Sequence, residues 1–199
     1  MKNHLSKGLL AAALLFGCAA AQADPATYAA SLSGAAEAPP NDSPATGSVH
    51  VVFDIATHYL SIAASFHGLE GYSGAAHIHC CTAVPGTGTA GVATMLPTFP
   101  GFPADVTDGN YAAVFDTSLA SFWNASFISN HGGTTAGAEA ALLAALEAGT
   151  SYFNIHSTEY PGGEIRGFLA PIPEPGQAVL LLAGLPLLLL LRRRRAPAQ

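Results

Sequence analysis

Positively charged side chains are almost missing from the middle of this chain. Residues 24–171 contain no lysine and a single arginine, Arg166, against twelve acidic residues, which is a formal net charge of −11. A field of this sign repels phosphate groups, so it excludes binding to nucleic acid or to an anionic membrane surface through charge. A metal ion, a cationic partner or a neutral polymer stays compatible with it.

Catalytic motifs are also missing. The sequence contains no nucleophile elbow, no kinase or Rossmann motif and no zincin helix. The turn at Pro161-Gly-Gly163 has no lysine and no following helix that would hold a phosphate. We therefore do not predict an enzyme from motifs.

Polar side chains are scarce in a stretch near the N-terminus. Residues 1–23 contain Lys2 and Lys7, then an apolar run, then the small residues Ala21-Gln22-Ala23. A charged start, an apolar centre and an A-x-A site are the three parts of a secretory signal peptide in their usual order. We predict cleavage after Ala23 and export of the rest of the chain.

A second apolar stretch, residues 177–191, lies near the C-terminus and is followed by Arg192, Arg193, Arg194 and Arg195. It has no polar face, which excludes a soluble amphipathic helix. It is short for a membrane span of about 20 residues, but tilt and flanking residues can extend it. The arginines would stay in the cytoplasm, which leaves the domain outside. The chain thus divides into a signal peptide (1–23), one domain (24–171) and a tail (172–199).

The domain has the pattern of an antiparallel β protein. From Tyr59 to His67, for example, apolar and polar residues alternate with the period of two that is typical of a half-buried strand. Further strands are expected at residues 28–34, 46–54, 76–80, 111–116, 151–157 and 164–169, and a loop at 82–110. One helix is predicted over 136–148, with Thr135 as its N-cap and Gly149 as its stop. We predict a single antiparallel β-sandwich or barrel-like domain with one short helix, besides the apolar C-terminal helix.

Histidines lie on the expected strands in a pattern that suits a metal ion. His77 and His79 are two residues apart, so on a strand they share a face and can reach one ion. His156 lies on another strand and supplies a third nitrogen if the strands are neighbours, and His67 is a candidate for a fourth. A thiolate of Cys81 on the same face would favour copper or zinc. The alternative is that these histidines form hydrogen bonds to strand backbone or to Glu159 and Glu164.

Two cysteines remain after Cys18 leaves with the signal peptide. Cys80 and Cys81 are adjacent, and Cys81 shares the face of His77 and His79 if the strand continues. Free thiols rarely persist in an oxidising compartment unless they bind a metal. A disulfide within the pair, a bond between chains and metal binding all stay open, and we favour a disulfide.

Glu164 and Arg166 place a carboxylate and the domain's one guanidinium two residues apart on the last expected strand. An arginine among twelve acidic residues is expected to pair with one of them. We interpret this motif as structural, holding the closing strand in register.

The tail resembles a PEP-CTERM sorting signal. Residues Pro173, Glu174 and Pro175 are followed by the apolar stretch and the arginine cluster, in the order of that family. The resemblance implies recognition by an exosortase, membrane insertion before processing, and delivery to the envelope surface or extracellular matrix. It also makes an exopolysaccharide or matrix component a candidate partner. Whether the tail is cleaved or kept as an anchor stays open.

The middle of the chain, residues 27–170, resembles a CHRD domain, the module named for chordin. The resemblance rests on residues 32–40 (LSGAAEAPP), 74–79 (GAAHIH), 146–156 (LEAGTSYFNIH) and 160–167 (YPGGEIRG). Ser157 replaces the family's usual threonine, and Cys80-Cys81 replaces a more common Gly-Pro. The resemblance implies an extracellular β fold without a defined biochemical activity.

Three hypotheses follow. The first is a non-enzymatic surface or matrix protein that presents a binding or structural module. The second, compatible with the first, is a copper- or zinc-binding domain that uses His77, His79 and His156, with redox activity as an extension. The third is a metal-dependent oxidoreductase, which needs an open coordination position and a pocket that the sequence does not show.

Overall fold

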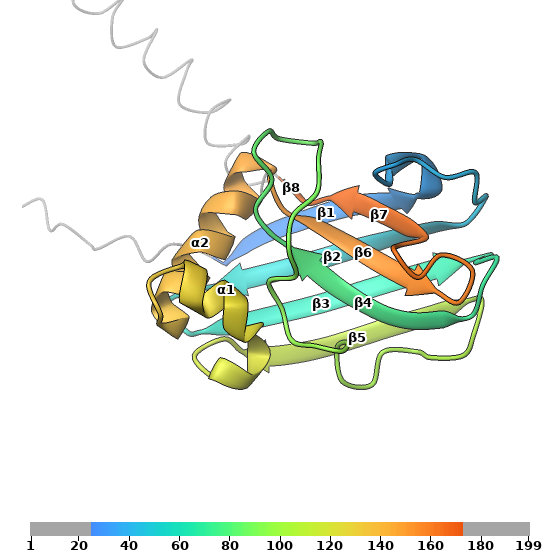
Figure 1. The fold of residues 1–199 in the computed structure, drawn as a ribbon. Coiled ribbons are helices and arrows are strands. Elements are labelled where there is room, and N and C mark those ends of the chain that lie inside the picture. The colour runs from blue at the N-terminus through green and yellow to red at the C-terminus, as the bar shows by residue number, and fades with distance from the viewer. Residues whose placement is uncertain (1–24, 173–199) are drawn as a thin grey trace, which may run out of the picture.

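A computed structural model describes residues 25–172, so the predicted signal peptide and the predicted sorting tail lie outside the described residues. The described part is mostly β, as predicted. One eight-stranded antiparallel sheet curls into a half-barrel (Figure 1). Among residues 25–172 no helix has the length and the apolar character that crossing a membrane requires.

Seven strands lie close to their predicted positions, with boundaries that differ by a few residues, and the two-residue strand β8 was not predicted. The strands are β1 (Ala26–Ser33), β2 (Thr46–Asp54), β3 (Tyr59–His67), β4 (Ser73–His79), β5 (Gly109–Asp116), β6 (Tyr152–Ser157), β7 (Ile165–Phe168) and β8 (Ala170–Pro171). Their order in the sheet is β4-β6-β7-β1-β2-β3-β5, and β8 pairs with β1. The late strands β6 and β7 therefore lie between β4 and β1, which brings the two ends of the domain together.

The helices gather at one end of the sheet (Figure 1). They are α1 (Ala125–Asn130) and α2 (Thr135–Ala148), with the short 3₁₀ turn η2 (Ala120–Phe122) before α1. A second 3₁₀ turn, η1 (Gly34–Ala36), follows β1 at the opposite end of the sheet. The predicted N-cap was wrong by one residue, because the side chain of Thr134 accepts the hydrogen bond from the Gly137 backbone N–H. Gly149 ends α2 in the left-handed conformation, with φ of 66°, which a residue without Cβ adopts at little cost.

The core lies on one face of the sheet and under α2. On β3 the residues Leu60, Ile62, Ala64 and Phe66 are all buried, as their alternation predicts. They meet apolar residues of the other strands and of the helix, among them Val51, Ile78, Phe153, Ile155, Leu142 and Leu146. Burial of this continuous apolar face supplies the main free energy of folding.

A long loop, residues 80–108, joins the two edge strands of the sheet (Figure 1). It forms hydrogen bonds along the free edge of β4, for example from the Cys80 N–H to the Gly91 carbonyl and from the Ala93 N–H to the Ile78 carbonyl. An uncovered edge would expose unpaired backbone groups. The loop therefore protects β4, and its residues Ala93, Phe99 and Phe102 join the apolar core.

Candidate metal centre

The register between β4 and β6 brings three histidines to one place. His77 lies opposite Asn154, His79 lies opposite Tyr152, and His156 lies opposite Ala75. Paired residues of an antiparallel ladder point to the same face. All three imidazoles therefore project from the face opposite Ile78 and Phe153, which belong to the apolar core.

The three rings converge closely enough to hold one ion. One ring nitrogen from each of His77, His79 and His156 lies within 4.8 Å of the other two. The Nδ1 atom of His77 is 3.4 Å from the Nε2 atom of His156. Two nitrogens bound tetrahedrally to a zinc ion at about 2.0–2.1 Å lie roughly 3.4 Å apart.

Backbone carbonyls of three loop residues fix the tautomer of each ring. His77 Nε2 donates to the Pro97 carbonyl at 2.7 Å. His79 Nδ1 donates to the Ala90 carbonyl at 2.9 Å, and His156 Nδ1 donates to the Pro161 carbonyl at 2.9 Å. Carbonyl oxygens only accept, so the proton of each neutral ring lies on the outer nitrogen and the lone pair on the inner one. This arrangement of ligand and supporting carbonyl is typical of histidines that bind metals.

The surroundings keep the rings neutral. Burial lowers the pKa of His77 and of His156 below the ordinary value. Burial also lowers the pKa of His79 to about 4, against the opposing effect of its bond to Ala90. His79 Nε2 is buried and has no hydrogen-bond partner within the described part of the chain. A buried nitrogen lone pair without a partner is costly, and a bound cation would satisfy it.

His67, the candidate for a fourth ligand, lies elsewhere. It is the exposed last residue of β3, and its Nδ1 atom lies 3.3 Å from a carboxylate oxygen of Asp108. The structure therefore brings together three of the four histidines that the sequence singled out. The acidic partners considered in the alternative hypothesis, Glu159 and Glu164, form no ion pair with these rings among the described residues.

Cys80 and Cys81 are joined to each other by a disulfide directly after His79. Cys80 is buried and Cys81 is exposed. In this state neither sulfur is a thiolate, the form that binds metals. The three imidazoles are therefore the candidate ligands.

Arg166 projects onto the same face from β7, opposite Asn154. Its acidic neighbour is Glu37, with Nε and Oε2 3.7 Å apart, rather than Glu164. Glu164 is fully buried and accepts hydrogen bonds from the Ser43 hydroxyl and from the Glu70 N–H. Glu164 and Arg166 thus contact different residues, but both link β7 and the residue before it to the loop between β1 and β2.

Tyr152 is a neighbour of the centre that the sequence reasoning missed. Its ring stacks on His79 with centroids 4.7 Å apart and an angle of 7° between the planes. Its hydroxyl donates to the Ala90 carbonyl, the same oxygen that orients His79. The period of two along β6 places Tyr152, Asn154 and His156 on one face, and this signal was available from the sequence.

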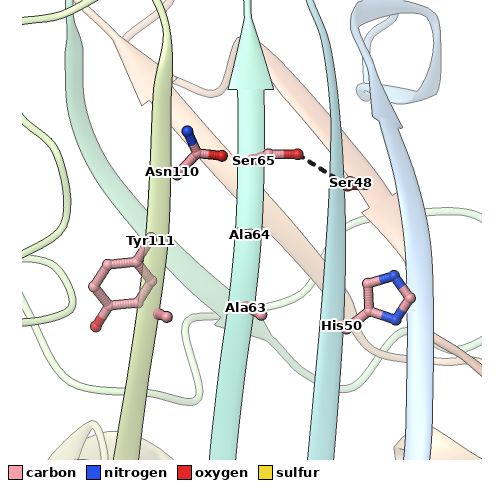
Figure 2. A pocket seen from close by; sticks show the side chains of 8 residues that line it. Ser48, His50, Ala63, Ala64, Ser65, Asn110 and Tyr111 are labelled. Atoms are coloured by element: carbon pink, nitrogen blue, oxygen red, sulfur yellow. Dashed lines mark hydrogen bonds between the residues drawn. The ribbon is translucent and has the colours of Figure 1, made fainter.

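A separate groove lies on the outer face of β2, β3 and β5. It has a volume of about 430 Å³, and Figure 2 shows Ser48, Ser65 and Asn110 in a row across the three strands. The two serine hydroxyls are hydrogen-bonded to each other at 3.0 Å. Its lining includes one histidine, His50, and no carboxylate, lysine, arginine or cysteine, so it holds no cluster of metal ligands.

A curled antiparallel sheet with three converging histidines on the face opposite its apolar core thus defines a mostly β domain with a candidate metal centre. The CHRD domain family matches residues 28–169, which is most of the chain, and the chain belongs to that family. CHRD domains are typically extracellular, and family membership indicates a binding or structural module. No curated protein and no solved structure matches the chain.

Proposed function

We propose that this chain is an exported CHRD-domain protein that binds one copper or zinc ion through His77, His79 and His156. One observation carries the proposal: three neutral imidazoles, each held by a loop carbonyl, direct their lone pairs toward one point. The hydrogen bonds to carbonyls account for the position of one nitrogen in each ring, but the other nitrogen, which faces the centre, has no hydrogen-bond donor among the described residues. A bound cation would accept the lone pairs of these inner nitrogens while the outer nitrogens keep their bonds to the carbonyls. The acidic net charge of the domain also attracts cations.

Metal content of the purified protein tests this proposal. The protein is loaded with Cu or Zn, desalted and analysed for elements, beside a double variant, His77→Ala with His79→Ala. A second double variant, His50→Ala with His67→Ala, removes two exposed histidines and is the matched control. We expect one metal ion per chain in the wild type and the control and none in the first variant. Absence of metal in the loaded wild type would leave a metal-free extracellular module.

We also propose that the two ends of the chain set its location. The predicted signal peptide exports the domain, and the tail, with Pro173, Glu174 and Pro175 before the apolar stretch and Arg192–195, passes it to an exosortase at the membrane. Delivery to the envelope surface or matrix would place the metal centre beside exopolysaccharide. Replacing the three residues of the Pro-Glu-Pro motif by alanine should leave the full-length tail on the protein, as mass spectrometry of the envelope fraction would show. If the wild type and the variant both had the mass of the protein with its full-length tail, the proposed processing would be contradicted.

A further inference from the structure

The nearest buried positive charge to the candidate centre belongs to Arg166. Its guanidinium carbon lies 4.7 Å from the centroid of the Tyr152 ring, and Tyr152 in turn stacks on His79 at 4.7 Å. Arg166 is 3 % exposed. Its charge is therefore weakly screened by solvent and acts on the centre across two stacked steps.

Hydrogen bonds hold this charge in place. Arg166 donates from Nε to the Ala36 carbonyl and from a terminal nitrogen to the Gly88 carbonyl at 3.0 Å. It also lies 5.5 Å from the Phe168 ring. Carbonyl oxygens and aromatic faces stabilise a guanidinium without adding a full negative charge. The positive charge is thus fixed but only partly compensated.

Glu37 is the one carboxylate paired with Arg166 among the described residues. Burial raises the pKa of Glu37 to about 7, and this effect exceeds the lowering by Arg166 and by the hydrogen bond from Asn154. Glu37 is therefore protonated in a large fraction of molecules at neutral pH. In those molecules the charge of Arg166 has no counter-charge.

The ligands themselves add no negative charge. Among residues 25–172 the cluster consists of three histidines, with no carboxylate and no thiolate in it. A divalent ion bound there keeps its full double charge beside a buried guanidinium, whereas a monovalent ion keeps half of it. Zinc also requires a fourth ligand, while monovalent copper is stable with fewer.

Solvent access points the same way. The Nε2 atom of His79 is shielded from solvent, His77 is 6 % exposed, and His79 and His156 as whole residues are half-buried. A water-poor site stabilises the lower charge state, because the loss of hydration is smaller for a monovalent ion than for a divalent one.

We propose that this centre is selective for monovalent copper, Cu(I), and that Arg166 sets the selectivity through its charge. The inference rests on the proposed metal-binding function and specifies the ion. The buried ring of Tyr152 lies between the charge of Arg166 and the ligand His79. Arg166 does not contact the ion and is a residue that tunes its charge state.

The test compares three ions on the same protein. Cu(I) is titrated anaerobically against the chelator bicinchoninate with ascorbate present, and Cu(II) and Zn(II) are titrated against matched chelators. We expect the lowest Kd for Cu(I). Arg166→Gln should reduce the ratio of Cu(II) to Cu(I) dissociation constants by about tenfold, which is the effect of one charge across roughly 10 Å of protein. Arg166→Lys, which keeps the charge, is the control and should retain most of the ratio.

A second variant guards against loss of folding in the arginine variants. Glu37→Gln removes the counter-charge and leaves Arg166, so it should increase the preference for Cu(I) at about pH 8, above the Glu37 pKa of about 7. Tighter binding of Zn(II) or Cu(II) than of Cu(I) by the wild type would overturn the inference while leaving metal binding intact. If the ratio of Cu(II) to Cu(I) dissociation constants were equal in the wild type, Arg166→Gln and Glu37→Gln, the role of Arg166 would be overturned. Absence of binding by all three ions would overturn the proposed function itself.

Discussion

His77 Nδ1 and His156 Nε2 face each other at 3.4 Å, although the two residues lie on different strands and are 79 positions apart. Each ring donates its proton to a carbonyl on the opposite side, to Pro97 for His77 and to Pro161 for His156. Two lone pairs therefore point at each other. Such an arrangement is unfavourable in an empty polar site and favourable around a cation.

Loss of His156 should remove the stabilisation that a metal provides. A ligand that binds the folded state stabilises it by about 2.7 kcal/mol at a free concentration of 100 times Kd. We expect the wild type to gain this amount with Cu or Zn and His156→Ala to gain almost none. Thermal unfolding with metal and with a chelator measures the difference. His67→Ala should behave as the wild type does, and an equal gain in His156→Ala would remove that residue from the ligand set.

Acid should destabilise the metal-free protein through His79. Its pKa is lowered to about 4 in the fold from a reference value of about 6.5 in the unfolded chain. As pH falls, the unfolded chain binds the proton before the folded chain does. The contribution of neutral His79 to stability is therefore complete above about pH 6.5 and decreases progressively until about pH 4. The loss from this residue amounts to roughly 3 kcal/mol. Urea unfolding in the presence of a chelator measures the free energy of unfolding as a function of pH, which should change less for His79→Gln than for the wild type. The same pH dependence in both proteins would contradict the role given to His79.

His58 should have the opposite pH dependence. It lies in the turn between β2 and β3, and its Nδ1 atom is 2.8 Å from Oε1 of Glu139, a buried residue of α2. The hydrogen bond to Glu139 raises the pKa of His58, and Asp116 and Asp54 add to the effect. The stabilising contribution is therefore complete below the unfolded pKa and is lost as pH rises through the higher folded pKa.

The variant His58→Asn tests this pair, because asparagine tolerates the positive φ of 56° at this position. The free energy of unfolding of the wild type should exceed that of the variant at pH 5.5, and the gap should narrow by pH 8.5. Comparison with His50→Asn, at an exposed position on β2, controls for a general effect of histidine. A gap that does not change with pH would exclude the ion pair as its cause.

Close approach of two strands should make Gly167 difficult to replace. A Cβ atom at this position would lie 2.2 Å from the backbone oxygen of Ser31 on β1. Gly167→Ala must push β7 away from β1, and we expect a loss of about 2–4 kcal/mol in stability. At Gly74 the nearest atom to an added Cβ is the His156 oxygen at 4.0 Å, so Gly74→Ala is the matched control. Chemical denaturation of both variants gives the comparison, and equal stabilities would exclude the steric explanation.

Local periodicity was enough to predict the strands and the placement of His77 and His79, because alternation is a property of neighbouring residues. The carbonyls of Ala90, Pro97 and Pro161 could not be predicted, since they come from loops whose path depends on the whole fold. The carboxylate that pairs with Arg166 could not be predicted from the sequence either. Glu37 lies 129 positions away, and no local pattern connects the two.

The helix α1 was missed for a related reason. It has six residues, and of these only Phe127 is buried. A helical stripe needs at least two turns to show its period of 3.6 residues. The capping side chain of Asn124, which accepts from the Ser126 N–H, is the local signal that was present.

The three loop carbonyls have a consequence for the thermodynamics of metal entry. Metal ligands in proteins commonly lose protons when they bind, which makes binding pH-dependent and adds the ionisation heat of the buffer. Here the rings are already neutral near pH 7, and each proton lies on the nitrogen that faces a carbonyl rather than the ion. A metal ion that bound at this candidate centre would displace no proton. Its heat of binding would therefore be the same in buffers of different ionisation enthalpy, and the ion could arrive and leave without any exchange of acid with the surroundings.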